Sequence, residues 1–188
     1  MQLILASTSP YRRALLQRLD LSFEQASPGF EEATPGSMPP DELVEHNTLG
    51  KARSVLNIAP HATIIASDQI AVCGDIVLGK PGTIARAEQQ LQLLSGKRVT
   101  FLTGLCVLDA DSCRYELIPY HVCFRTLSRS EISRYVALEQ PLECAGSFKS
   151  EGLGISLFDK MEGHDPTALI GLPLIRLSQW LRPLELRS

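Results

Sequence analysis

The 188-residue sequence has few cysteines, no excess of positive charge and no long apolar run. Its five cysteines are odd in number and lack CxxC spacing, which argues against a disulfide framework or a zinc site. They favour free, mostly buried thiols in a reducing compartment. No stretch reaches the roughly 18 apolar residues of a membrane span, and residues 1–6 lack the basic region of a signal peptide. We therefore expect a cytoplasmic protein with no membrane partner.

The sequence has no excess of positive charge: 18 Lys and Arg oppose 21 Asp and Glu, for a net charge of -3. A protein that binds nucleic acid non-specifically carries a basic stripe, so polymeric nucleic acid is not an expected partner. A single phosphorylated small molecule stays possible because it needs only a few cations. With 44% hydrophobic and 21% charged residues, the composition is that of a globular protein, and the length predicts one domain over residues 1–188.

Apolar periodicity and turn residues predict alternating strands and helices. Expected strands cover residues 2–6, 23–26, 63–66, 70–73, 76–78, 99–108 and 115–125, and residues 143–157 are expected to mix strand with loop. Expected helices cover residues 10–19, 40–57, 84–94 and 128–138, with a last helix after Pro173. Two strand pairs joined by short turns predict hairpins, which a purely parallel doubly wound sheet lacks. The expected fold class is therefore mixed α/β.

The first candidate for chemistry is the segment from Ser7 to Arg13, where a strand leads through a small-residue loop into a helix. Free N–H groups and the helix dipole attract anions at such a point. Ser7 adds a hydroxyl donor, and Arg12 and Arg13 suit the forked binding of phosphate oxygens. An ordinary capped helix with two solvated arginines is the alternative interpretation.

Asp68 is the second candidate, because it follows the apolar run 63–66 at the expected end of a buried strand. An ionised carboxylate there suits metal binding or the orientation of an attacking water, although an Asx turn is equally compatible. Glu31 and Glu32 lie in a long expected loop at 27–40 and offer the oxygen ligands that magnesium or manganese prefers. Two solvated loop acids are the simpler interpretation of that pair in isolation.

Lys51 and Lys80 add cations, although a lone lysine is usually a surface residue. Motifs for other chemistries are absent: there is no Gly-x-Ser-x-Gly elbow, no Walker A loop and no GxGxxG. The remaining inventory of cations, carboxylates and hydroxyls fits the metal-assisted hydrolysis of a polyphosphate.

These residues, in this order, resemble the Maf family of nucleoside triphosphate pyrophosphatases. The matching segments are Leu5-Ala6-Ser7-Thr8-Ser9-Pro10-Tyr11-Arg12-Arg13, Glu31-Glu32, Lys51-Ala52, Ser67-Asp68-Gln69, Gly79-Lys80-Pro81, Leu94-Ser95-Gly96, Val99-Thr100, Thr103-Gly104, Ala145-Gly146-Ser147 and Gly171-Leu172-Pro173. Each match is modest alone, but together they cover nearly the whole chain in register.

The resemblance implies a bent mixed sheet flanked by helices, with a central cleft and a fold related to inosine triphosphate pyrophosphatases. It implies hydrolysis of a nucleoside triphosphate to the monophosphate and diphosphate, assisted by Mg or Mn, and a homodimer. Asp68 matches the general base and a metal ligand, and Glu32 matches the metal-binding acid. The phosphate-binding positions are matched by Ser7, Arg12, Arg13, Lys51 and Lys80.

Three positions that differ between subgroups of the family are occupied by Tyr11, Gln69 and Glu151, and with residues 144–152 they resemble the subgroup acting on 7-methyl-GTP. Methylation at N7 makes guanine cationic, so stacking on Tyr11 adds a cation–π contribution of about 0.5–2 kcal/mol. Glu151 suits the N1 and N2 donors of guanine, although a simple loop acid is the alternative. Tyr11 is a departure, since this subgroup is associated more with Trp there.

Two alternatives stay open. One is a pyrophosphatase of the same family that prefers UTP, TTP or other modified nucleotides. The other is a non-catalytic nucleotide-binding regulator of cell division, against which the intact set of Asp68, Lys51 and Lys80 argues.

Overall fold

The computed structural model describes residues 2–185. These residues form two compact units, and each unit is built from segments that are separated in the sequence. Unit 1 contains residues up to 69, 103–118 and from 165 onward, whereas unit 2 contains residues 70–102 and 119–164. The interpretation of residues 1–188 as one domain stays a prediction. Within residues 2–185, no helix has the length and apolar character needed to cross a membrane.

The described residues form a seven-stranded sheet in the order β2-β1-β3-β5-β6-β7, with β4 paired to β3. The strands are β1 (Leu3–Ala6), β2 (Glu24–Ala26), β3 (Thr63–Cys73), β4 (Ile76–Leu78), β5 (Arg98–Leu108), β6 (Cys113–Phe124) and β7 (Phe158–Glu162). The helices are α1 (Pro10–Gln17), α2 (Pro40–Leu56), α3 (Ile84–Leu94), α4 (Arg129–Glu139), α5 (Pro166–Ile170) and α6 (Leu174–Glu185). Parallel pairing of β1 with β2 and β3 coexists with antiparallel β3–β4 and β6–β7 pairs. The expected mixed α/β class is confirmed.

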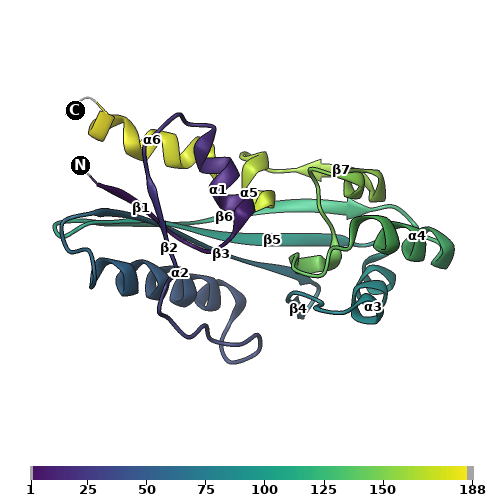
Figure 1. The fold of residues 1–188 in the computed structure, drawn as a ribbon. Helices are drawn as coiled ribbons and strands as arrows, with labels where there is room; N and C mark the ends of the chain where they lie inside the picture. Colours follow the sequence, from purple (N-terminus) through teal and green to yellow (C-terminus); the bar gives the residue numbers. More distant parts are fainter. Residues whose placement is uncertain (1, 186–188) are drawn as a thin grey trace. The chain divides into compact units, whose positions relative to one another are not determined.

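Unit 1 is a layered structure because its strands alternate apolar side chains between two buried faces. Leu3, Leu5 and Ile65 point into a cluster with residues of α1 and α6. Ile4 and Ile64 point the other way, toward α2. Figure 1 accordingly shows α2 on one side of these strands and α1 and α6 on the opposite side.

Unit 2 has an aromatic core. The ring of Phe148 packs edge-on against Phe101, Phe124 and Phe158, with ring centroids 4.8–5.6 Å apart. Such edge-to-face geometry adds to the free energy gained by burial alone. Helices α3 and α4 pack against each other in the same unit.

Two expectations about local structure are wrong. The strand expected to end before Ser67 continues to Cys73, so Asp68 lies inside β3 and not at its end. The polar side chains at 67–69 are tolerated there because each finds a hydrogen-bond partner. Residues 143–157 contain two short 3-10 helices, Ala145–Ser147 and Leu153–Leu157, and no strand.

The short helix α5, which the sequence analysis did not predict, is held by a buried carboxylate. Asp165 caps the helix: its Oδ1 accepts bonds from the N–H of Thr167 at 3.0 Å and from the hydroxyl of Thr167 at 2.6 Å. Its Oδ2 accepts from the N–H of Ile175 at 2.7 Å, and the Thr167 hydroxyl accepts from the N–H of Leu174 at 2.7 Å. These bonds tie α5 to the start of α6 across the turn at Gly171.

Replacing Asp165 with Ala is expected to lower the free energy of unfolding by about 2–4 kcal/mol, because a helix cap is lost and buried donors are left unpaired. Urea denaturation followed by circular dichroism measures the change. Asp111→Ala is the matched control, since Asp111 is exposed in the β5–β6 turn and its loss should cost less than about 0.5 kcal/mol. Equal stability of the two variants would contradict the structural role of Asp165.

Candidate active site

The loop between β1 and α1 is held in place by local hydrogen bonds. Ser9 is the N-cap of α1 and accepts a bond from the N–H of Arg12 at 3.3 Å, and Pro10 starts the helix, as the sequence predicts. Ser7 is buried, and its hydroxyl oxygen accepts a bond from the N–H of Ser9 at 3.1 Å. Gln25 donates to the Ser7 carbonyl at 2.7 Å, which ties the loop to β2.

Lys51 lies between two carboxylates. Its Nζ is 2.6 Å from Oδ1 of Asp68 and 2.7 Å from Oε1 of Glu32. Lys51 and Asp68 are almost fully buried, at 5% and 6% exposure, whereas the Glu32 side chain is 57% exposed. A buried ion pair of this kind is retained only where both charges are satisfied. One candidate from α2 and one from β3 are thus brought together with a third from the loop before α2.

Arg12 completes this charge cluster from α1. Its Nε donates to the carbonyl of Gly171 at 2.9 Å, so the guanidinium is held at one edge and keeps its remaining donors for other partners. Burial lowers the pKa of Arg12 from its ordinary value, whereas the negative charges of Asp68 and Glu32 act to raise it. The same Gly171 carbonyl also accepts a bond from the hydroxyl of Ser67 at 2.8 Å.

Gly171 itself is a requirement of this arrangement. Its φ of 119° lies in the region that favours glycine, and a Cβ added there would lie 3.4 Å from Nε of Arg12. A side chain at this position would strain the turn and press on the anchored guanidinium.

Gln69 is held by α5. Its Nε2 donates to the Thr103 hydroxyl at 3.0 Å and to the carbonyls of Ala168 and Leu169 at 2.7 Å and 3.1 Å. The amide nitrogen therefore anchors α5 to β3, and the role of Gln69 in choosing a base stays a prediction.

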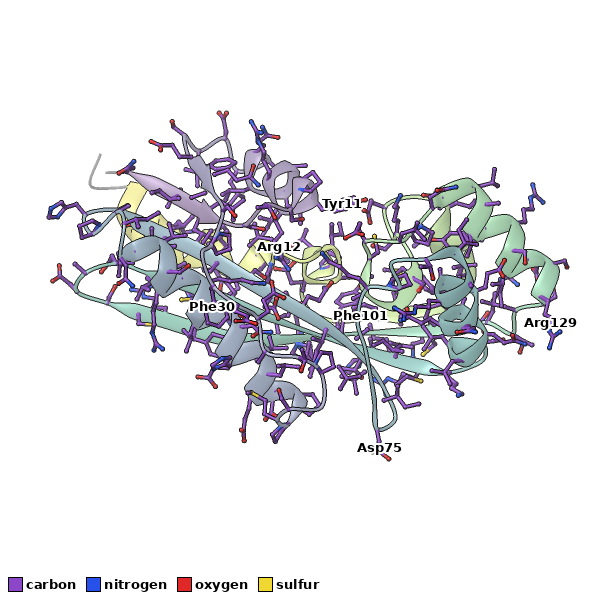
Figure 2. The ribbon with its side chains drawn as sticks, turned by 60° about the horizontal axis from the view of Figure 1, so that its bottom comes forward. Tyr11, Arg12, Phe30, Asp75, Phe101 and Arg129 are labelled. Atoms are coloured by element: carbon purple, nitrogen blue, oxygen red, sulfur yellow. The ribbon has the colours of Figure 1, made fainter. Side chains whose placement is uncertain are left out.

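The other predicted site residues are more exposed. Tyr11 is half-buried near the start of α1, where Figure 2 labels it. Arg13 lies on the same helix and is exposed. Lys80 and Glu151 belong to unit 2 and are both exposed. Lys80 lies 3.4 Å from the carboxylate of Glu143, and Glu151 accepts a bond from the hydroxyl of the preceding serine at 3.3 Å. Their roles in binding phosphate or base stay predictions.

The donor set around Lys51 fits a hard divalent cation. Magnesium is commonly bound by one or two carboxylates together with substrate phosphates and waters. Glu32 and Asp68 supply two carboxylates, each bound to Lys51 through one of its two oxygens. No group of three or more His, Cys, Asp or Glu side chains suited to a metal occurs among residues 2–185. A metal held here would therefore depend on the phosphates of the substrate for its other ligands.

Sequence reasoning assigned no role to three buried polar residues near the site: Asn47, Ser67 and Thr103. Asn47 contacts Asp68, Ser67 binds the Gly171 carbonyl, and Thr103 binds Gln69 and the Ala168 carbonyl. Asn47 is the most informative, since its Nδ2 lies 3.4 Å from Oδ2 of Asp68. A signal was available, because Asn47 lies four residues from both Leu43 and Lys51 and therefore shares the buried face of α2.

The sequence is similar to proteins of one family. The family described as "Maf-like protein" matches residues 2–184. A protein of Alkalilimnicola ehrlichii named 7-methyl-GTP pyrophosphatase is 54% identical over 181 residues, which are 95% of this chain and 91% of that protein. Proteins with the same name from Alcanivorax borkumensis and Pseudomonas aeruginosa are 51% and 52% identical, over 95% of this chain and 92% and 94% of theirs.

Among solved structures, that of the Staphylococcus aureus Ham1 protein matches with a TM-score of 0.47 and 16% identity, covering 66% of this chain and 71% of that one. The family match covers almost all of the sequence, and the similar proteins are about half identical over nearly their full length. The chain belongs to the Maf family.

Proposed function

We propose that this protein is a nucleoside triphosphate pyrophosphatase that hydrolyses 7-methyl-GTP to 7-methyl-GMP and diphosphate. The observation that carries the proposal is the buried contact of Lys51 with Asp68, with Glu32 on the other side of the ammonium group. The names of relatives at 51–54% identity support the choice of substrate. The activity would remove a modified nucleotide from the nucleotide pool.

In the proposed reaction, a water attacks the α-phosphorus, and the bond from that phosphorus to the bridging oxygen of the leaving diphosphate breaks. Asp68 orients the water and accepts its proton, since its carboxylate is held in one orientation by Lys51 and Asn47. Arg12 and Lys51 donate to phosphate oxygens on which negative charge develops. Glu32 and Asp68 would hold a magnesium or manganese ion, which supplies charge neutralisation at the phosphates.

Choice of base is assigned to Tyr11, Gln69 and Glu151. Tyr11 offers an aromatic face to the cationic ring of 7-methylguanine. Glu151 offers a carboxylate to the N1 and N2 donors of guanine, a pair that a pyrimidine does not present. The remaining proposed phosphate contacts are those of Ser7, Arg13 and Lys80. A cytoplasmic location and a homodimer remain part of the proposal.

Incubation with a panel of triphosphates tests the substrate. With Mg or Mn present, we expect diphosphate release from 7-methyl-GTP to exceed that from GTP, UTP and TTP by at least about tenfold in kcat/KM, or about 1.4 kcal/mol, because the cation–π contribution is absent for the neutral bases. Preference for UTP or TTP would overturn the choice of base and leave the reaction standing. Failure to hydrolyse any nucleotide would favour the non-catalytic regulator of cell division.

A further inference from the structure

The loop before α2, residues 27–39, is fastened to that helix by Asn47 through a pair of hydrogen bonds. Oδ1 of Asn47 accepts from the N–H of Ala33 at 2.9 Å, and Nδ2 donates to the carbonyl of Ala33 at 3.3 Å. A side-chain amide carries both a donor and an acceptor, so it can bind both backbone groups of one residue. Ala33 directly follows Glu32, so this pair of bonds fixes the backbone next to the loop carboxylate.

The same amide nitrogen also faces Asp68 on β3. Nδ2 of Asn47 lies 3.4 Å from Oδ2 of Asp68, whose other oxygen binds Lys51. Asn47 is 3% exposed, so its bonds are shielded from competing water. One buried side chain therefore touches both the loop that carries Glu32 and the proposed general base.

A second anchor lies one turn further along the helix. Gly50 is three residues after Asn47 and so shares its face of α2. The ring of Phe30 lies directly on Gly50, so closely that a Cβ at position 50 would overlap it. The same ring also packs near the ring of His46, with the two ring centroids 5.6 Å apart. Figure 2 shows Phe30 beside α2. The two anchors fall on either side of Glu32 in the loop sequence.

We propose that Asn47 is a positioning residue of this site, which sets the distance between Glu32 and Asp68 by binding the loop and β3 at once. The Phe30–Gly50 contact assists it by pressing the start of the loop onto the helix. The inference rests on the proposed function for its catalytic consequence only. Fastening of the loop is a property of the protein without any nucleotide.

Asn47→Leu tests the proposal, because leucine has a similar volume and cannot make any of the three hydrogen bonds. Hydrogen exchange of residues 31–34 in the protein without nucleotide is expected to accelerate at least about tenfold as the loop detaches. In turnover, the Mn concentration for half-maximal activity should rise at least about fivefold, since a misplaced Glu32 weakens a site of two carboxylates. Asn57→Leu, at the exposed end of the same helix, is the matched control and should change neither value.

Phe30→Ala is the second variant, chosen because the half-buried ring of Phe30 forms the second anchor of the loop. Like Asn47→Leu, it should accelerate hydrogen exchange at 31–34 and raise the Mn concentration for half-maximal activity. If N47L does not melt cooperatively, this variant tests whether fastening of the loop controls both quantities. Unchanged exchange at 31–34 in a folded variant would overturn the proposal, whatever the activity. Faster exchange in a preparation in which the unaltered protein hydrolyses no nucleotide would keep the loop anchor and reject the proposed function instead.

Discussion

Asp68→Asn is expected to lower kcat by about 10³-fold while leaving the protein folded. The substitution keeps the shape of the side chain but removes the charge that accepts a proton from water, and loss of a general base typically costs 10²–10⁴-fold. An amide at this position can still accept a bond from Lys51, which retains Glu32 as its ionic partner. Diphosphate release measured at saturating 7-methyl-GTP gives kcat, and thermal melting checks the fold.

Asp75→Asn is the matched control for this variant. Asp75 lies in the exposed turn between β3 and β4, where Figure 2 labels it, and its neutralisation should leave kcat within about twofold. Retention of more than a tenth of the activity by D68N would reject Asp68 as the base. The same variant separates catalysis from regulation, because a cellular effect that persists in D68N does not depend on hydrolysis.

Lys51→Met is expected to lower kcat/KM and, in the protein without nucleotide, to raise the affinity for Mn. Methionine keeps the aliphatic stem but removes the ammonium group between Glu32 and Asp68. Loss of one charged donor to the developing phosphate charge should lower kcat/KM by about 10²–10³-fold. The two carboxylates then lose their shared counter-ion, so a divalent cation becomes the only positive charge available between them. Without nucleotide, Mn should therefore bind at least about tenfold more tightly than in the unaltered protein.

Electron paramagnetic resonance of free Mn measures that affinity without any turnover. Lys97→Met is the matched control, since Lys97 is exposed in unit 2 and should affect neither value. If the affinity of K51M for Mn were unchanged or weaker, the carboxylates beside Lys51 would not be the metal ligands. The proposed contact of Lys51 with phosphate is tested separately, by the change in kcat/KM.

Much of this molecule could be predicted from local patterns. The N-cap at Ser9 with Pro10 after it gives the start of α1. The runs at 99–108 and 115–125, with a short turn between them, predict a pair of strands, and the structure has neighbouring strands at Arg98–Leu108 and Cys113–Phe124. These features depend on residues that are neighbours in the sequence. The predictions are correct at these places because local preference and tertiary packing favour the same structure.

The polar residues inside β3 could not be placed by the same reasoning. A run of Ser, Asp and Gln after an apolar stretch normally marks the end of a strand, and here it is the strand interior. The burial of Asp68 depends on Lys51, and that of Ser67 on the carbonyl of Gly171, which is 104 residues further along the chain. The spacing of residues within one segment does not reveal a partner that lies in another segment of the chain. The spacing of Asn47 from Leu43 and Lys51 indicates that it is buried, but it does not reveal the partner. Asn47 binds the main-chain N–H and carbonyl of Ala33, and every residue type carries these groups.

The bond from Arg12 to the carbonyl of Gly171 joins residues that are 159 positions apart. During synthesis, the N-terminal strand and helix leave the ribosome long before the turn that orients this arginine exists. The nascent chain therefore carries Arg12 without this orienting bond until residue 171 has emerged. Contacts of such long range also slow folding, because a large loop must close before they contribute. A chain that stops before Gly171 would keep every charged residue proposed for the site and lose the bond that orients Arg12.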